Sequence, residues 1–159
     1  MEQIETVITP CDYTNTDHLH AICRLMNTYI NDKMGGGEPL SKLQQLRLVN
    51  GLEQHPTSIV LLAEHNGVFC GLLVAFELFS TFTVSPMLNI HDLIVSPEYR
   101  GKGIGRQLLQ HITAIGEERS CSRISLEVRM DNEIAQGLYR NIGFTEADPP
   151  MYYWRKSLK

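Results

Sequence analysis

Three glycines and three basic residues share one short segment of the chain, and such residues are suited to binding phosphate. The segment spans residues 95–106 and reads Val-Ser-Pro-Glu-Tyr-Arg-Gly-Lys-Gly-Ile-Gly-Arg. Glycines at alternate positions let the backbone turn tightly and aim several N–H groups at one point. A helix that begins there adds the partial positive charge of its N-terminus. The segment therefore predicts a site for a diphosphate, formed by Arg100, Gly101, Lys102, Gly103, Ile104, Gly105 and Arg106.

Two common diphosphate motifs do not fit this segment. A Walker A loop ends in Gly-Lys-Ser/Thr, whereas Gly105 is followed by Arg106 and Gln107. The dinucleotide fingerprint Gly-x-Gly-x-x-Gly fails in both frames, because Arg106 or Leu108 stands where its third glycine belongs. The alternative without a ligand is a glycine-rich turn that only joins a strand to a helix.

The spacing that remains resembles the Arg-x-x-Gly-x-Gly signature of the GNAT acetyltransferases, with Arg100, Gly103 and Gly105 at its fixed positions. Downstream, the family pattern Asn-x-x-Ala-x-x-Leu-Tyr-x-x-x-Gly-Phe is matched by Asn132, Ala135, Leu138, Tyr139, Gly143 and Phe144. The resemblance covers about residues 88–144. The chain is similar to uncharacterised bacterial GNAT proteins and, more loosely, to spermidine/spermine-type acetyltransferases.

The resemblance implies acetyl-coenzyme A as the cosubstrate, and we expect no metal. It implies that the pantetheine arm of the cofactor pairs with the strand before the turn, at Leu93, Ile94 and Val95. The diphosphate is then expected on residues 100–106.

Residues of the second motif are implied to complete the cofactor site. Asn132 and Ala135 are expected to contact the cofactor, and Tyr139 is expected near its sulfur. Asn132 is equally suited to capping a helix, and Tyr139 to packing as a half-buried aromatic. Gly143 and Phe144 are interpreted as a helix stop followed by a core residue.

Acetyl transfer to an amine requires a neutral nucleophile and a protonated leaving thiol. A primary amine is deprotonated only about once in 2,500 at pH 7, so a base is useful. His91 and Asp92 are the candidate bases, and strand alternation predicts that they point to opposite faces. Glu77 and Glu127 are further candidates. The hydroxyl of Tyr139 stays protonated at neutral pH and is the candidate acid.

The acceptor side of the site is less constrained by the sequence. Spermidine/spermine-type enzymes place an acidic residue where His91 stands, which argues against a polyamine acceptor. A histidine hydrogen-bonded within the sheet is the structural alternative. Phe79 and Phe82 either wall an acceptor pocket or pack a hairpin, and the packing interpretation is favoured. The glycine-rich loop at 34–39 is either a lid or a flexible connection.

The hydrophobic pattern predicts the elements that must position these residues. Apolar residues at helical spacing indicate four helices, at Thr16–Met34, at 43–55, at Gly103–Arg119 and at Asn132–Asn141. The stripe of the second helix consists of Leu43, Leu46, Val49 and Leu52, and the residues of the last helix expected to face inward are Ile134, Ala135, Leu138 and Ile142. Apolar and β-branched runs indicate strands around Ile4–Ile8 and at Ser58–Glu64, Val68–Phe79, Met87–Val95, Ile124–Val128 and, at the sheet edge, Met151–Ser157.

The order of these elements predicts an α/β fold with a mixed sheet flanked by helices. The family resemblance implies the GNAT fold, with a mostly antiparallel, twisted sheet of about six or seven strands and about four helices. No linker or repeat divides the chain, so we expect one acetyltransferase domain over residues 1–159.

Composition and charge exclude several classes of function. A net charge of -4 gives no general attraction to nucleic acid or anionic membrane. The apolar stretch Ile59–Phe82 is interrupted by polar residues and glycines, so it cannot span a bilayer as a helix. The four cysteines show no paired spacing, and residues 1–5 do not resemble a signal peptide. We therefore expect a cytoplasmic protein.

The sequence predicts an N-acetyltransferase that acts on a small amine or on an amino group of a peptide or protein. The absence of a Gly-x-Ser-x-Gly elbow favours direct transfer within a ternary complex. The alternative is a non-catalytic acyl-CoA-binding regulator with the same fold. A homodimer is expected from the habit of the family. The sequence does not identify the acceptor amine.

Overall fold

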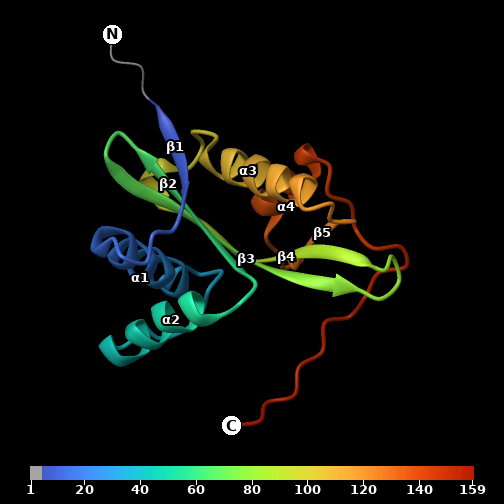
Figure 1. Cartoon of the computed structure of the whole chain (residues 1–159), viewed down its shortest axis with the longest axis horizontal. Coiled ribbons are helices and arrows are strands. Elements are labelled where there is room, and N and C mark those ends of the chain that lie inside the picture. Colours follow the sequence, from blue (N-terminus) through green and yellow to red (C-terminus); the bar gives the residue numbers. More distant parts are fainter. Residues whose placement is uncertain (1–4) are drawn as a thin grey trace.

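The computed structural model describes residues 5–159 and places a five-stranded sheet between two pairs of helices (Figure 1). The strands are β1 (Thr6–Pro10), β2 (Ser58–His65), β3 (Val68–Ser80), β4 (Ser85–Val95) and β5 (Ile124–Leu126). The helices are α1 (Thr16–Asn31), α2 (Lys42–Gln54), α3 (Ile104–Glu118) and α4 (Glu133–Ile142), and a 3₁₀ turn spans Pro97–Tyr99. None of the described helices has the length and hydropathy needed to cross a membrane.

The strands follow one another across the sheet in the order β1-β2-β3-β4-β5. The first four pair antiparallel, and β5 pairs parallel to β4 at the edge. Asn66 and Gly67 join β2 to β3 with φ values of 51° and 77°, as a two-residue hairpin turn requires. β3 and β4 extend beyond β2 as a two-stranded arm, which we call the hairpin arm (residues 77–87).

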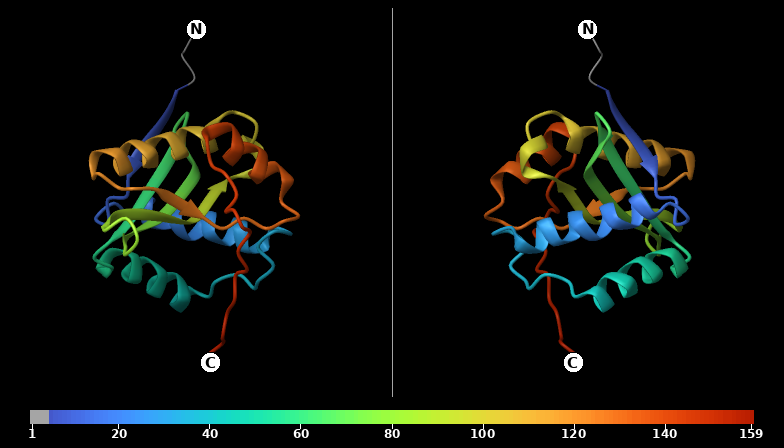
Figure 2. Two further views of the ribbon diagram at one scale, coloured as in Figure 1. Left: turned by 90° about the vertical axis from the view of Figure 1, so that its right-hand side faces the viewer. Right: turned by 90° about the vertical axis from the view of Figure 1, so that its left-hand side faces the viewer.

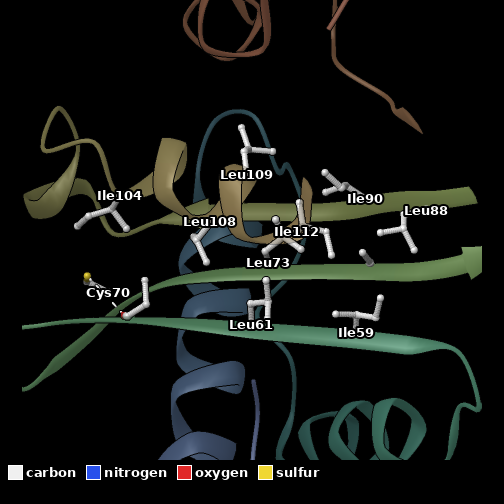
Figure 3. Packing of buried hydrophobic residues seen from close by; sticks show 12 residues of the cluster. Ile59, Leu61, Cys70, Leu73, Leu88, Ile90, Ile104, Leu108, Leu109 and Ile112 are labelled. Carbon is white, nitrogen blue, oxygen red and sulfur yellow. Dashed lines mark hydrogen bonds between the residues drawn. The ribbon is translucent and has the colours of Figure 1, made fainter. Parts of the chain in front are cut away.

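Helices cover both faces of the sheet (Figure 2). A separate hydrophobic core lies on each face. The α3 core consists of Ile59, Leu61, Ala63, Cys70, Leu73, Ala75, Leu88, Ile90, Ile104, Leu108, Leu109 and Ile112, ten of which are labelled in Figure 3. The α1/α2 core consists of Ala21, Ile22, Leu25, Leu52, Val60, Leu62, Leu72, Val74 and Ile94. Adjacent strand residues therefore alternate between the two cores, as the period of a strand requires.

Gly71 of β3 lets α3 pack closely on the sheet. A methyl group there would lie 2.9 Å from Cβ of Ala63 and 3.1 Å from Cγ2 of Ile104. Ile104 is the first residue of α3, and it is fully buried. The missing side chain of Gly71 therefore fixes where α3 begins relative to the end of β4.

The α/β class and the mixed sheet are confirmed, but three predicted features are wrong. Met151–Ser157 forms no strand; the described sheet has five strands instead of six or seven. Pro149 and Pro150 precede that segment and have no N–H groups to donate to a strand ladder. The first helix ends at Asn31 instead of Met34.

The predicted inward faces of two helices are also partly wrong. Ile134, expected in the core, is 90% exposed on the first turn of α4. Leu43 and Leu46 of α2 are exposed, and only Val49 and Leu52 of that predicted stripe are buried. The part of the first predicted strand at Ile4 lies outside the described residues.

Candidate active site

The predicted diphosphate turn has the backbone geometry of an anion cradle. We call residues 100–106 the glycine turn. Gly101 and Gly103 have φ values of 77° and 79°, which favour glycine. The first helical bond of α3 runs from the N–H of Gln107 to the carbonyl of Gly103, at 3.0 Å. The N–H groups of residues 103–106 therefore have no acceptor within the helix and point out of its N-terminus.

Gly105 joins the glycine turn to the elements around it. It is buried, and a methyl group there would lie 3.2 Å from Cδ2 of Leu138 and 3.8 Å from Cγ2 of Val95. Leu138 belongs to α4, and Val95 is the last residue of β4. The start of α3 is thus held between the strand and the helix that carry the other predicted cofactor residues.

Arg100 is bound to the protein itself. Its Nε donates to the carbonyl of Val95 at 3.1 Å, and its Nη2 donates to Oδ2 of Asp32 at 3.2 Å. Asp32 follows α1, and its carboxylate also accepts the N–H of Met34 at 3.0 Å. The Met34 N–H, followed by Arg100, holds the pKa of Asp32 below its ordinary value. Arg100 therefore links the loop after α1 to the end of β4.

Lys102 is positioned by an aromatic contact. Its Nζ lies 5.1 Å from the ring centre of Tyr99, a cation–π arrangement. The ring of Tyr99 packs edge-on against His65 at 5.8 Å, and Nδ1 of His65 lies 2.8 Å from Oγ1 of Thr6. This chain of contacts connects the glycine turn to β1 and β2. Arg106, by contrast, is exposed on the first turn of α3.

β4 has an unpaired edge that leads to the glycine turn. Its pairing with β5 runs only from Leu88, opposite Ile124, to Ile90, opposite Leu126. Among the described residues, no strand pairs with residues 91–95 on that side. We call this the β4 edge. An extended chain with amide groups, such as pantetheine, suits such an edge because it can hydrogen-bond as a strand does.

A β-bulge at His91 changes the side to which the following residues point. Asp92 pairs with Val74, whereas Ile90 pairs with Ala75, so His91 is the extra residue in β4. Residues paired across an antiparallel ladder point to the same face, and Val74 belongs to the α1/α2 core. Asp92 therefore faces that core.

The side chain of His91 lies toward the same face as Asp92. Its ring packs edge-on against Phe76, with 4.8 Å between ring centres, and Phe76 packs against the α1/α2 core. The prediction that His91 and Asp92 point to opposite faces is therefore wrong, because simple alternation does not hold across a bulge. Burial raises the pKa of the half-buried Asp92, and His91 opposes that shift. His91 is exposed.

Asn132 and Tyr139 are brought to the site by α4. Oδ1 of Asn132 accepts the N–H of Ala135 at 3.2 Å, so Asn132 has the capping role that the sequence offered as an alternative to cofactor contact. Tyr139 is half-buried beside Phe144, with 5.8 Å between ring centres. Burial and, to a smaller extent, Tyr29 of α1 raise the pKa of Tyr139. The hydroxyl therefore remains a proton donor over a wide pH range.

The helix stop at the end of α4 is confirmed. Gly143 has a φ of 103° and its N–H donates to the carbonyl of Arg140 at 3.1 Å. Phe144 packs against the α3 core. These two residues are structural, and they fix the orientation of the helix that carries Tyr139.

The loop after α1 contributes residues that the sequence analysis missed. Nη1 of Arg129, in the segment between β5 and α4, lies 3.5 Å from the carbonyl of Met34. Arg100, which follows β4 in the chain, forms an ion pair with Asp32 of the same loop. Gly35 is required, because a side chain there would overlap the carbonyl of Tyr29. Sequence spacing gave no signal for Tyr29 or Asp32, since their partners come from distant segments.

Four other candidates lie away from this arrangement or are open to solvent. Glu77 pairs with Arg119 at 2.8 Å, between the hairpin arm and the end of α3. Glu127 is exposed after β5. Phe79 and Phe82 are 61% and 93% exposed on the hairpin arm, so the favoured interpretation as packing residues is wrong for both.

The comparison with known families gives the family of this fold. The model of the acetyltransferase (GNAT) family matches residues 23–144. The chain therefore belongs to the GNAT family of acetyltransferases, and the fold and family expected from the sequence are confirmed.

Individual relatives support the same family. The chain is 30% identical over 102 residues to the uncharacterized N-acetyltransferase YhfO of Bacillus subtilis, covering 64% of this chain and 68% of that protein. It is 36% identical over 77 residues to the ribosomal protein bS18-alanine N-acetyltransferase of Escherichia coli, covering 48% of this chain and 51% of that protein. These matches therefore span about half to two thirds of the relatives' lengths.

A solved structure shows the same fold over nearly the whole chain. The aminoglycoside N-acetyltransferase AAC(6')-Iy in complex with CoA superposes with a TM-score of 0.76 at 18% identity, covering 98% of each chain. At this identity the likeness concerns the fold alone.

Proposed function

We propose that this protein transfers the acetyl group of acetyl-CoA directly to a primary amine within a ternary complex. One observation carries the proposal: the unpaired β4 edge leads directly to the free N–H groups at the start of α3. An extended thioester arm and a diphosphate, joined in that order, match these two features. The membership in the GNAT family supports the same cofactor.

The proposed path of the cofactor uses residues from three elements. The pantetheine arm lies along the main chain of Leu93, Ile94 and Val95, and the diphosphate on the amides of residues 103–106. Lys102, held over Tyr99, and Arg106 supply side-chain charge to the phosphates. Asn132 and Ala135 at the start of α4 lie along the opposite side of the arm.

The proposed chemistry uses Asp92 as the base and Tyr139 as the acid. Asp92 takes a proton from the ammonium group of the acceptor, directly or through a water molecule, and its raised pKa makes it a better acceptor than an ordinary carboxylate. The neutral amine then attacks the thioester carbonyl carbon. As the carbon–sulfur bond breaks, Tyr139 donates its proton to the leaving sulfur. The new amide nitrogen loses its extra proton to solvent, and Tyr139 regains a proton from solvent.

His91 is proposed to assist Asp92 from the exposed side of the bulge. Its ring lies against Phe76, close enough to influence the pKa of Asp92. His91 opposes the effect of burial on this pKa, so it is proposed to adjust the strength of Asp92 as a base.

The acceptor is proposed to be an amine of a small molecule or of a peptide. Asp92 and His91 face the α1/α2 core, so the acceptor would approach from the side of those helices. According to their names, the bS18-alanine enzyme acts on an alanine of a ribosomal protein and the other enzyme on an aminoglycoside. Both acceptor classes therefore belong in the first experiment.

The four cysteines are free of disulfides, which supports a cytoplasmic location.

The test combines calorimetric binding of CoA with release of free thiol from acetyl-CoA across a panel of amines. The panel contains polyamines, aminoglycosides and peptides with a free N-terminal alanine. We expect saturable CoA binding and turnover with one class of acceptor. Binding without turnover on any acceptor would instead support a non-catalytic acyl-CoA-binding regulator. No binding of CoA would refute the proposed cofactor site.

A further inference from the structure

Three aromatic rings lie side by side next to the proposed base. Phe76 of β3 lies between His55, which follows α2, and His91 of β4. The ring centre of Phe76 is 4.7 Å from that of His55 and 4.8 Å from that of His91, with interplanar angles of 70° and 69°. Both are edge-to-face contacts, so the ring of Phe76 is held from two sides. We call these three residues the ring cluster.

The ring cluster and Asp92 share one face of the sheet. Phe76 lies two residues after Val74 on β3, and both side chains pack on the α1/α2 core. Asp92 is paired with Val74 across the ladder and therefore points to the same face. Two residues along a strand span about 7 Å. The carbon skeleton of an amine held at Asp92 can therefore reach the ring of Phe76.

This face is open to solvent at the ring cluster and along the hairpin arm. His55 and His91 are exposed, and Leu78, the next residue of β3 on this face, is 48% exposed. The hairpin arm projects beyond α1 and α2, so these helices do not extend over its face (Figure 1). An acceptor at Asp92 therefore meets an aromatic and apolar surface.

The charge on this face suits one amino group better than several. β3 and β4 contain two acidic residues, Glu77 and Asp92. Glu77 points to the opposite face, where it pairs at 2.8 Å with Arg119, the residue after α3. Asp92 is therefore the only carboxylate that these two strands place beside the ring cluster. A second ammonium group of a polyamine would lie against apolar side chains without a counter-charge, which costs free energy.

We propose that the acceptor is a small monoamine that carries an aromatic ring. Its amino group lies at Asp92, and its ring packs on the ring cluster and on Leu78. An aromatic acceptor gains from ring–ring contacts as well as from burial, whereas an aliphatic one gains from burial alone. Phe76 is then the residue that determines specificity. This inference rests on the proposed acetyl transfer and selects one class among the small amines.

Three matched acceptors test the inference by release of free thiol from acetyl-CoA. Phenylbutylamine, butylamine and diaminobutane share one carbon chain and one reacting amino group. The far end of the chain carries a phenyl ring, a hydrogen atom or a second amino group. We expect kcat/KM to fall about tenfold from phenylbutylamine to butylamine, and about tenfold again to diaminobutane.

The other outcomes separate this inference from the proposed function. Equal rates with the three amines, or the fastest turnover with diaminobutane, would overturn the inference and leave acetyl transfer in place. Turnover on peptides or aminoglycosides alone would do the same. Binding of CoA without turnover on any amine would overturn both.

Variants on the two faces of β3 locate the surface. Leu78→Glu adds a carboxylate on the face of the ring cluster, so we expect kcat/KM for diaminobutane to rise about tenfold relative to that for phenylbutylamine. Phe79→Glu is the matched control, because it adds the same charge at the next residue, which is 61% exposed on the opposite face. Its ratio is expected to equal that of the wild type. Equal changes of the ratio in the two variants would refute the surface.

Phe76→Leu removes the ring but keeps an apolar side chain on the α1/α2 core. We expect KM for phenylbutylamine to rise about tenfold and KM for butylamine to stay unchanged. A merely structural role of Phe76 would raise KM for both amines by the same factor, and that result would overturn its role in specificity. Circular dichroism checks that the variant is folded.

Discussion

Asp92 combines two properties that an efficient base needs, which are an accessible carboxylate and a pKa above the ordinary value. Burial is the main cause of the raised pKa, and the neighbouring His91 opposes it. Complete burial would raise the pKa so far that the carboxyl group stays protonated at neutral pH. Full exposure would leave the pKa at its ordinary value, and the carboxylate would be a weak base. The half-buried position beside an exposed imidazole lies between these two extremes.

Replacing Asp92 with Asn is expected to lower kcat by about 10²–10⁴-fold, the usual scale for a general base. The acidic limb of the pH–rate profile should disappear in this variant, because it reports the ionisation of Asp92. Steady-state rates across pH measure both effects. If the variant keeps the acidic limb at a reduced rate, Asp92 positions the substrate and another group is the base. His91→Gln is the companion variant, expected to shift that limb without removing it.

Asp92→Asn should also change the free energy of unfolding, in a direction that follows from the raised pKa of Asp92. Because the pKa of Asp92 is raised in the folded state, the folded protein binds this proton more tightly than the unfolded chain. Its contribution to stability is fully present below the unfolded pKa and is lost as pH rises through the folded pKa. Asp92→Asn should therefore raise the Tm at neutral pH and leave it unchanged in acid. Calorimetry at both pH values checks this.

Tyr139→Phe removes only the hydroxyl of a half-buried ring that packs beside Phe144. We expect turnover to fall by about 10²–10⁴-fold with unchanged affinity for CoA, because the packing of the ring is kept. Single-turnover kinetics and calorimetry separate the two quantities. A rate equal to that of the wild type would leave Tyr139 as a packing residue. Tyr29→Phe is the control at the neighbouring hydroxyl, expected to have a smaller effect.

At the scale of elements, two glycines with different structural roles, Gly103 and Gly105, determine how α3 begins. Gly103 has a positive φ and open space around it, whereas Gly105 is enclosed by Leu138 and Val95. Gly103 therefore permits the turn, and Gly105 permits the close packing. The glycine turn is therefore packed against the protein at Gly105 and has open space at Gly101 and Gly103.

A side chain at Gly103 should interfere with the cofactor without disturbing the core. Gly103→Val is expected to weaken CoA binding about tenfold or more, because strain at a positive φ costs about 1–3 kcal/mol and the new methyl groups crowd the cradle. Calorimetry measures the affinity. Gly67→Val is the matched control, since Gly67 has a φ of 77° and open space in a distant hairpin turn. Equal affinity in both variants would place the diphosphate elsewhere.

The features of this site that depend on neighbouring residues could be predicted from the sequence. Those that depend on contacts between distant segments could not. The glycine turn, the cap at Asn132 and the stop at Gly143 depend on nearby residues, so their patterns are visible in the chain. The bulge at His91 is visible only against its partner strand, so alternation assigned the wrong face to one residue. Asp32 meets Arg100 across 68 positions of sequence, a contact that no local pattern records.

At the scale of the whole molecule, the two cores are joined through a sheet that has little room for adjustment. Gly71 is enclosed by Ala63 from the neighbouring strand and by Ile104 and Leu108 from α3. The position of α3 over the sheet therefore depends on the absence of one side chain. Because α3 carries the glycine turn, a change in this packing would alter the cofactor site as well as stability.

Gly71→Ala is expected to lower stability by about 1–3 kcal/mol through overpacking, which corresponds to a fall in Tm of about 2–10 °C. Affinity for CoA should fall with it, because α3 must shift. Gly116→Ala is the matched control. Gly116 lies on α3, and a methyl group there would lie 3.4 Å from Cδ1 of Leu88, an ordinary contact distance. Thermal unfolding of the two variants decides the matter. Equal Tm values would mean that the sheet and α3 adjust freely at Gly71.

The extra residue in β4 has one more consequence. The residues of β4 that face the α3 core change from even-numbered to odd-numbered at position 91. Leu88 and Ile90 face that core before the bulge, and Leu93 and Val95 face it after the bulge. The extra residue therefore places two polar side chains, His91 and Asp92, in succession on one face and leaves the apolar residues beyond them on the faces that their partners in β3 require. A β4 strand without this insertion would keep Asp92 opposite Val74 but would present only one polar side chain at this point.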